Sequence, residues 1–555
     1  MQATPQSARY MYVNSVKHII LSLQFLPCFI ALFAPITVSS KPPQKPPNII
    51  LILADDQRWD SVGFMGQKNG QTPHLDQLAK EGYVFENAFV TSAICTPSRV
   101  SYFLGQYERR HGVNFNSGTA ISQNAWEASY PTLLKKAGYT TAYIGKNHVP
   151  IGADGYHSGH FENSFDFWYA GHKHLGFYPK KRHSIFSNAK LDTQTEILSQ
   201  GVQAFLNPSS HSNFYKSAET SLNPRDLEKP FCLTISLNLP HSFSVSRMKQ
   251  YPADDELYRT TYRDQLHTLP LPPFYLPKNE CIHPKLPADL LFQDLRQASY
   301  DWVNSEDTLR ERLVRTMQTI TGIDQMIGTL RNTLNDQGLN ENTIIIFTSD
   351  HGLQYGEFGL GGKALCYDTC LRVPLLIYDP RQKESERLPH LAQSIDIAPT
   401  LLHLAGLTPP NTMQGESLLP LIRKQNILWR QVAFGENLWS NQHGNPRCET
   451  VRTDQYRYIR YFQNDRHEKI HATDQSLANA YASSLTSSIQ GEPIVYEELY
   501  HTAIDPYEAT NLIHNKNYSD IAEELRSECK KLVRVAKGPL HHPPETISLN
   551  TIKQK

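Results

Sequence analysis

The sequence has no excess of either charge. Its cysteines are few, and none is spaced as a Cys-x-x-Cys motif requires. Lys and Arg together number 54, as do Asp and Glu. A nucleic-acid-binding protein would show a basic excess, so we expect no nucleic-acid partner. None of the eight cysteines belongs to a Cys-x-x-Cys pair. Zinc-ribbon and thioredoxin-like proteins therefore find no support.

Long apolar segments are also scarce. Only residues 19–33 form such a run, with basic residues before it and small residues after it. This pattern is typical of a signal peptide, here residues 1–40, and predicts a secreted or periplasmic protein. A retained membrane anchor is the alternative, although Gln24 and Pro27 interrupt the run. No later segment is apolar enough to cross a bilayer, so we expect no stable membrane span.

The remaining cysteines are odd in number. Once Cys28 leaves with the signal peptide, seven stay in the mature chain. In an oxidising compartment, an odd count suggests that one cysteine has a role other than pairing. Cys366 and Cys370 are near enough in sequence to suggest a bridge.

Continuous apolar runs alternate with helical patterns along most of the chain. Runs of this kind are typical of strands buried on both faces, and their alternation with helices predicts an α/β fold with a mostly parallel central sheet flanked by helices. The predicted strands are Asn48–Leu53, Thr141–Ile144, Phe231–Leu237, Thr343–Phe347 and Val373–Tyr378. The predicted helices are Leu75–Glu81, Pro131–Ala137, Thr195–Phe205, Leu309–Leu334 and Ile397–Leu404.

The pattern changes toward the C-terminus. Residues 41–47 are proline-rich and predict an extended linker, which the large α/β domain follows at residues 48–421. Alternating segments at 431–434 and 450–461 and a late helix at 521–535 predict a smaller α+β domain at 422–540, followed by a tail at 541–555. Within the large domain, residues 240–305 have weak periodicity and predict a long insertion that shapes a cleft.

Polar side chains follow several of the predicted strands. Asp55 and Asp56 follow the first strand, and Asp350 and His351 follow a later one. Ligands of open α/β sheets bind at the carboxyl ends of the strands. Three clustered carboxylates would repel one another without a cation, and calcium accepts several oxygen ligands in irregular geometry. A turn or helix cap is the alternative for the Asp55–Asp56 pair alone.

A second motif is Cys95-Thr96-Pro97-Ser98-Arg99. Pro97 suits the first helical position, and an apolar stretch follows. Cys95 would then lie just before a helix N-terminus, where an anion is favoured, and Arg99 could point back at the same anion. A buried structural cysteine is the alternative.

This CTPSR segment resembles the modification motif of type I sulfatases, in which the cysteine is oxidised to formylglycine. The early DD pair, GKNH at 145–148, PH at 240–241, TSDHG at 348–352 and GGK at 361–363 also resemble sulfatase segments. The similarity spans nearly all of the mature chain. Among carbohydrate sulfatases, the chain resembles iduronate-2-sulfatase-like and choline-sulfatase-like enzymes. It implies the alkaline-phosphatase-like fold with a small C-terminal domain.

The resemblance also implies roles for individual residues. One calcium ion per chain would be bound by Asp55, Asp56, Asp350, His351 and the modified Cys95. Arg99 would orient the nucleophile, and the residues around the sulfate would be Lys146, His148, His241 and Lys363. Many relatives have Asn where this chain has His351, so that ligand departs from the common pattern.

The implied function is calcium-dependent hydrolysis of sulfate esters, on a sulfated carbohydrate, by a formylglycine derived from Cys95. A formylglycine-generating enzyme would then be a partner during maturation. One alternative is a phosphonate monoester or phosphodiester hydrolase of the same superfamily. Another is a sulfoglycan-binding protein without activity. The aromatic stretch 156–183 either lines sugar subsites or forms structural loops.

Overall fold

The computed structural model describes residues 45–547 except 213, 215–221, 281–284, 292–299, 440–443, 465–473 and 540–541. The predicted signal peptide, most of the linker and the end of the tail lie outside the described residues. Within those residues, no helix has the length and apolar character needed to cross a membrane. The described residues from 46 onward belong to one compact unit. The domain boundary after residue 421 therefore stays a prediction.

The central sheet contains eight of the described strands, in the order β11-β2-β10-β7-β1-β6-β4-β5. All pairs in it are parallel except those that β10 forms with β7 and β2. The strands are β1 (Asn48–Ala54), β2 (Tyr83–Phe89), β4 (Thr140–Asn147), β5 (Phe167–His172), β6 (Phe231–Ser236), β7 (Thr343–Ser349), β10 (Leu375–Tyr378) and β11 (Glu386–Gln393).

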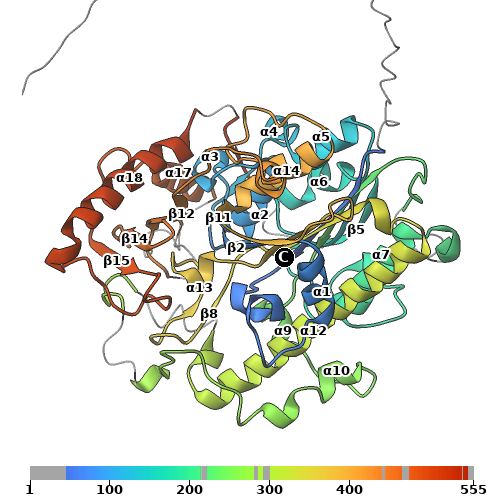
Figure 1. Ribbon diagram of the computed structural model, residues 1–555, viewed down its shortest axis with the longest axis horizontal. Coiled ribbons are helices and arrows are strands. Elements are labelled where there is room, and N and C mark those ends of the chain that lie inside the picture. The colour runs from blue at the N-terminus through green and yellow to red at the C-terminus, as the bar shows by residue number, and fades with distance from the viewer. Residues whose placement is uncertain are drawn as a thin grey trace, which may run out of the picture. The chain divides into compact units, whose positions relative to one another are not determined.

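Strand β1 shows why this sheet lies between two layers of helices. Alternate side chains of a strand point to opposite faces. Ile49 and Leu51 belong to one apolar core, whereas Ile50 and Ile52 belong to another, and all four are buried. Figure 1 shows the helices of the first core on one side of the sheet and those of the second on the other. The first layer includes α2 (Cys95–Leu104), α5 (Tyr130–Lys136) and α14 (Ile397–Leu404), and the second includes α1 (Pro73–Glu81), α7 (Gln194–Leu206) and α12 (Glu306–Asp336).

The predicted α/β class is confirmed, but the sheet contains more than the apolar runs indicated. Strands β2, β5 and β11 were not predicted. Polar or charged residues interrupt the sequences of β2 and β11, and β5 is a short aromatic segment that ends in Gly171 and His172. β11 is an edge strand, where one side of the ladder is unpaired and polar residues are tolerated. The run at 373–378 becomes β10, whose antiparallel direction no periodicity could reveal.

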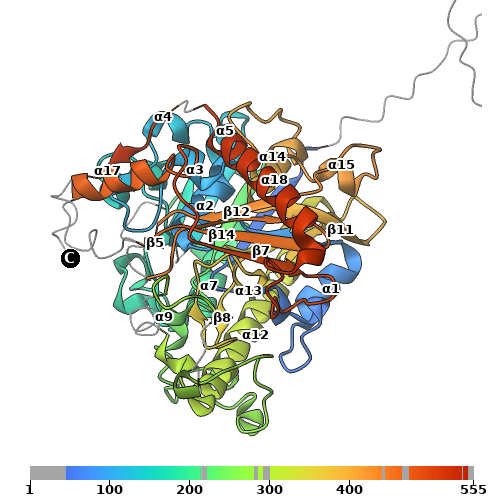
Figure 2. The ribbon, with the colours of Figure 1, turned by 90° about the vertical axis from the view of Figure 1, so that its left-hand side faces the viewer.

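A second sheet forms in the C-terminal region. It is antiparallel, in the order β12 (Ala433–Asn437), β13 (Cys448–Arg452), β14 (Tyr456–Tyr461) and β15 (Tyr496–His501). The alternation predicted over 450–461 is thus two strands joined by a turn. Helix α18 (Ser519–Lys537) contacts β12, β13 and β14, and Figure 2 shows it lying along this sheet. The smaller α+β unit matches the expected class.

The predicted insertion after residue 240 is largely irregular. Its described part contains only short helices, among them α9 (Ser242–Val245) and α10 (Glu256–Arg259). Both contact the long helix α12. The insertion is therefore held against the second helical layer, beside the carboxyl end of β6.

The cysteines are arranged differently from the expected Cys366–Cys370 bridge. Both of these thiols are free, and the Cys366 Sγ lies 3.3 Å from the Sγ of Cys448, which begins β13. Cys366 and Cys448 are buried and lie 82 residues apart in sequence. Sequence proximity was misleading because the second sheet brings a distant thiol closer.

This geometry predicts a disulfide between Cys366 and Cys448 when the chain folds in an oxidising compartment. A bond needs an Sγ–Sγ distance of about 2.0 Å, which a small closure would reach. Two thiols would exchange with an oxidised disulfide donor during folding, and the donor would leave as two thiols. Peptide mass spectrometry without reduction should find the cross-linked pair, with Cys232 and Cys370 alkylated as controls. Alkylation of both Cys366 and Cys448 in unreduced, unfolded protein would contradict the prediction.

Candidate active site

The predicted site residues converge at one edge of the central sheet. Strands β7, β1, β6 and β4 are consecutive neighbours and mutually parallel, so their carboxyl ends meet. Asp350 follows β7, Asp55 follows β1, His241 lies just after β6, and Lys146 is near the end of β4. The topology thus brings together side chains that are up to 295 residues apart in sequence.

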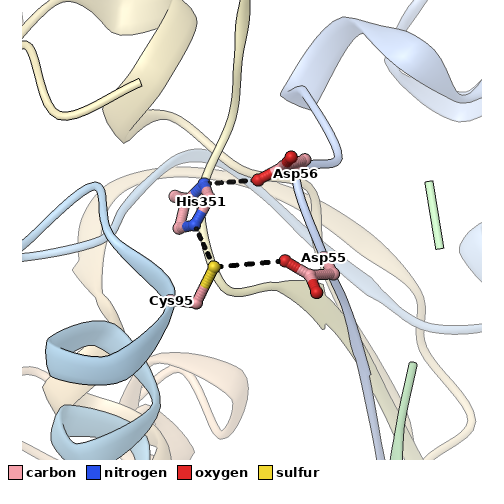
Figure 3. Close-up of side chains that lie close together, drawn as sticks. All are labelled: Asp55, Asp56, Cys95 and His351. Atoms are coloured by element: carbon pink, nitrogen blue, oxygen red, sulfur yellow. Dashed lines mark hydrogen bonds and ion pairs between the residues drawn. The ribbon is translucent and has the colours of Figure 1, made fainter. Parts of the chain in front are cut away.

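Four potential ligands cluster around the thiol of Cys95. The donor atoms of Asp55, Asp56, Cys95 and His351 all lie within 4.8 Å of one another, and all four residues are buried. Cys95 Sγ is 3.5 Å from Asp55 Oδ1 and 3.3 Å from His351 Nε2, and His351 Nδ1 is 3.4 Å from Asp56 Oδ1 (Figure 3). The chain therefore presents carboxylate, imidazole and position-95 atoms to one point.

The carboxylate of Asp350 borders this cluster and is held by other contacts. Its Oδ2 accepts a hydrogen bond from Arg99 Nε at 2.8 Å, and its Oδ1 accepts from the backbone N–H of Asp56 at 3.2 Å. Its Oδ1 also lies 3.5 Å from His351 Nε2. Asp350 thus connects Arg99 to the cluster.

The imidazole of His351 presents an unprotonated nitrogen toward Cys95. Its Nδ1 lies 3.0 Å from the carbonyl oxygen of Gly352, which can only accept, so Nδ1 carries the proton. Burial lowers the pKa of His351 and favours the neutral ring. The lone pair of Nε2 then faces the thiol and is available to a cation.

Two buried lysines neutralise the aspartates. Lys146 Nζ lies 2.5 Å from Asp55 Oδ2, and Lys363 Nζ lies 2.8 Å from Asp56 Oδ1 and 3.1 Å from Cys95 Sγ. Burial alone would raise the pKa of Asp55, but Lys146 and other cations outweigh it and hold that pKa well below its usual range. Asp55 is therefore ionised. Lys363, predicted from the GGK context alone, lies in the site.

Cys95 is the first residue of α2, so Pro97 is third in the helix rather than first. No side chain caps this N-terminus, and the N–H groups of the first turn favour an anion beside Cys95. Burial, followed by the charge of Asp55, raises the pKa of the Cys95 thiol to about 12. The thiol is therefore protonated at neutral pH, and an unmodified thiol would be a poor nucleophile.

Three histidines line the space above Cys95. His241 Nε2 is 3.3 Å from Lys363 Nζ, and the His174 ring centroid lies 4.5 Å from that of His241 and 5.2 Å from that of His148. His148 Nδ1 is buried and has no hydrogen-bond partner among the residues that the structure describes. Burial lowers the pKa of all three rings well below its usual range, so they are neutral and can accept protons.

Sequence reasoning assigned no individual role to three residues of the site. Asn238 Nδ2 donates to Asp55 Oδ2 at 2.6 Å, and Ser236 Oγ accepts from Arg99 Nη1 at 2.5 Å. Both lie at the end of β6, a position that could have indicated them. His174 was included only in the broad stretch 156–183, because nothing local distinguishes it from its neighbours.

The site opens into a cavity of about 430 Å³. Cys95, Lys363, His148 and His241 line this cavity, and the insertion contributes Ser242, Phe243, Ser246 and Arg247 to its wall. A second cavity of about 370 Å³ shares Phe115, His148 and His174 with the first and includes residues of the stretch 156–183. The insertion and this stretch thus both border the cleft.

Known proteins are similar to this chain over most of its length. The family model described as Sulfatase matches residues 47–407, and that described as N-sulphoglucosamine sulphohydrolase, C-terminal, matches residues 356–492. An arylsulfatase of Clostridium perfringens is 28% identical, over 89% of this chain and 95% of its own. An N-acetylglucosamine-6-O-sulfatase of Bacteroides thetaiotaomicron is 27% identical, over 76% of this chain and 79% of its own.

Solved structures share the fold. One is described as a complex with its substrate D-glucosamine-2-N,6-O-disulfate, and it matches with a TM-score of 0.61 at 22% identity, covering 89% of this chain and 98% of its own. A phosphonate monoester hydrolase of Agrobacterium radiobacter matches with a TM-score of 0.60 at 19% identity, covering 90% of this chain and 97% of its own. The fold alone does not distinguish the two chemistries.

The buried ion pairs of Arg99 generate a stability prediction. Arg99→Met would leave Asp350 and Asp55 without a partner that is now 2.8 Å and 3.7 Å away, in a fully buried site. We expect the free energy of unfolding to fall by about 3–5 kcal/mol, measured by urea denaturation. Arg387→Met, which removes an exposed pair with Glu86, is the control and should change it by less than about 1 kcal/mol. Equal effects would show that Arg99 does not stabilise the site.

Proposed function

Since the chain belongs to the sulfatase family and is a sulfuric ester hydrolase, we propose that it hydrolyses sulfate esters of carbohydrates with a formylglycine made from Cys95 and one bound calcium ion. The observation that carries this proposal is the position of Cys95 Sγ. It lies at a helix N-terminus, within 3.5 Å of Asp55, His351 and Lys363. In the modified enzyme, formylglycine oxygen would take the place of this sulfur.

The donor set fits a divalent cation. Asp55, Asp56 and Asp350 would supply carboxylate oxygens, position 95 another oxygen, and His351 the lone pair of Nε2. Calcium accepts several hard oxygen ligands, and a nitrogen ligand is the departure from that preference. When bound, the ion would polarise the sulfate oxygens and the nucleophile at position 95.

The balance of protein charges explains why such a site would attract a sulfate ester. The three negative formal charges of its carboxylates balance the three positive formal charges of Arg99, Lys146 and Lys363. A divalent cation would leave the buried site positive. The anionic ester would offset part of this positive charge, and Lys146 and Lys363 would meet the charge that develops on its oxygens.

The neutral histidines are suited to move protons. An aldehyde at position 95 adds water to form a diol, one hydroxyl of which attacks sulfur. The attacking hydroxyl would lose its proton through Lys363 to His241, whose Nε2 lies 3.3 Å from Lys363 Nζ, and His241 would deliver that proton to the departing alcohol. His148, whose Nδ1 has no partner, would accept the proton of the second hydroxyl, which releases sulfate and restores the aldehyde. Arg99 stays bound to Asp350 and holds the site in place.

The proposal extends to maturation and location. A formylglycine-generating enzyme would modify Cys95 before folding, because this residue is only 3% exposed in the folded chain. Residues 1–40 would direct export to the periplasm or beyond the cell. Export from the cytoplasm favours a sulfated polysaccharide outside the cell as the substrate class.

Modification of Cys95 is directly measurable. We expect the peptide that contains residue 95 to have a lower mass than the same peptide with an unmodified cysteine, because the CH2SH side chain becomes an aldehyde. Cys95→Ala should abolish turnover of 4-nitrophenyl sulfate, whereas Cys232→Ala, which removes another buried thiol, should retain it. An unmodified peptide in fully active enzyme would overturn the proposal. A phosphonate or phosphodiester hydrolase would instead prefer a 4-nitrophenyl phosphonate or phosphodiester in paired assays, and a binding protein would turn over none of these substrates.

The role of His241 predicts a dependence on the leaving group. His241→Gln should lower kcat for a sulfated sugar by about 10²–10⁴-fold, because an alcohol leaves only with a proton. The loss for 4-nitrophenyl sulfate should be much smaller, since nitrophenolate leaves without one. His403→Gln, on the exposed side of α14, is the control and should change neither rate. Equal losses on both substrates would show that His241 does not act as the proton donor.

A further inference from the structure

A pair of arginines stands on the wall of the cleft that leads from Cys95. Arg247 lines the first cavity and Arg182 lines the second, and the two cavities share Phe115, His148 and His174. Arg182 comes from the stretch 156–183 and Arg247 from the insertion after residue 240. Two segments outside the motif-bearing strands therefore bring their cations to one place.

Both guanidinium groups lie against the ring of Phe243. The Cζ atom of Arg247 is 3.4 Å from the ring centroid, and that of Arg182 is 4.8 Å away. Arg247 Nη1 donates to the carbonyl oxygen of Phe243, and Arg182 Nε donates to that of His174, both at 3.1 Å. Both guanidinium groups are thus held over one aromatic ring, as cation–π contacts favour.

Neither arginine forms an ion pair with a carboxylate among the described residues. Asp154 also lines the second cavity, but no ion pair joins it to either of them in that part of the chain. Partial burial lowers the pKa of Arg247, and the positive charge of Arg182 lowers it further. The two cations therefore repel each other, and an anion between them would relieve this repulsion.

Aromatic contacts connect this pair to the reaction site. The ring of Phe243 stacks on His174 with a centroid distance of 5.1 Å and an interplanar angle of 25°. His174 in turn lies 4.5 Å from His241. A sugar that places its sulfate ester beside His241 would therefore extend past His174 toward the arginines.

We propose that Arg182 and Arg247 form a subsite for a second anionic group, a carboxylate or another sulfate, on the saccharide whose sulfate ester is cleaved. This inference rests on the proposed function and deepens it. Arginine forks bind both anions in a planar, two-bonded manner. The preferred substrate is then a sugar or oligosaccharide with at least two anionic groups.

Binding to the full chain carrying Cys95→Ser, which cannot turn over its ligands, tests the subsite. Calorimetry would compare N-acetylglucosamine 6-O-sulfate with D-glucosamine 2-N,6-O-disulfate and with a 6-O-sulfated disaccharide that contains a uronate. We expect at least one of the two-anion ligands to bind about tenfold tighter than the one-anion ligand, as charge-assisted hydrogen bonds would give. The better of the two identifies the second anion as sulfate or carboxylate.

Substitutions then assign the preference to the two arginines. In the Cys95→Ser chain, Arg182→Gln and Arg247→Gln together should bring the ratio of two-anion to one-anion affinity close to one. Arg247→Lys alone should retain part of this ratio because the charge remains. Arg387→Gln, an exposed arginine on the β11 edge strand, is the matched control and should leave the ratio unchanged.

The proposal is overturned by equal affinities for one-anion and two-anion ligands, by no binding of either two-anion ligand, or by a ratio that survives the double substitution. Failure of the proposed function has a different signature. Wild-type enzyme would then hydrolyse neither 4-nitrophenyl sulfate nor the sulfated sugars, while the affinity ratio is still measured independently.

Discussion

The arrangement of the site depends on the compensation of buried charge at the carboxyl edge of the central sheet. Asp55, Asp56 and Asp350 are 0% exposed, and an isolated carboxylate at such a place would be protonated or would destabilise the fold. Arg99 and the two lysines satisfy them with contacts of 2.5–2.8 Å. Because the cations come from different elements, the balance exists only when strands and helix are in register.

The same burial decides the chemistry that the site can perform. It raises the pKa of the Cys95 thiol to about 12 and lowers those of the surrounding histidines. A protonated thiol surrounded by neutral imidazoles is a poor nucleophile, although the histidines remain competent to move protons. The site thus favours an oxygen nucleophile at position 95, which formylglycine would supply, and a substrate that arrives with its own negative charge.

In the proposed function, segments that carry no motif would recognise the substrate. The insertion and the stretch 156–183 place Phe243, Arg247, His174 and Arg182 along the cleft. The strand ends would hold the reacting sulfate, and the loops would contact the sugar attached to it. Such a division lets one set of catalytic residues act on different sugars, because loops can vary without disturbing the charge balance of the sheet edge.

The sequence by itself determined the α/β class and identified nearly all of the residues that carry the motifs of the candidate site. Buried parallel strands appear as apolar runs, and polar residues that follow them must meet at one edge, so Asp55, Lys146, His241 and Asp350 could be predicted. Only the tertiary structure decided the antiparallel direction of β10, the approach of Cys366 to Cys448, the contact of Asn238 with Asp55, and the arginine pair around Phe243. These contacts join segments that local periodicity does not relate, since they are set by how the second sheet and the irregular loops pack.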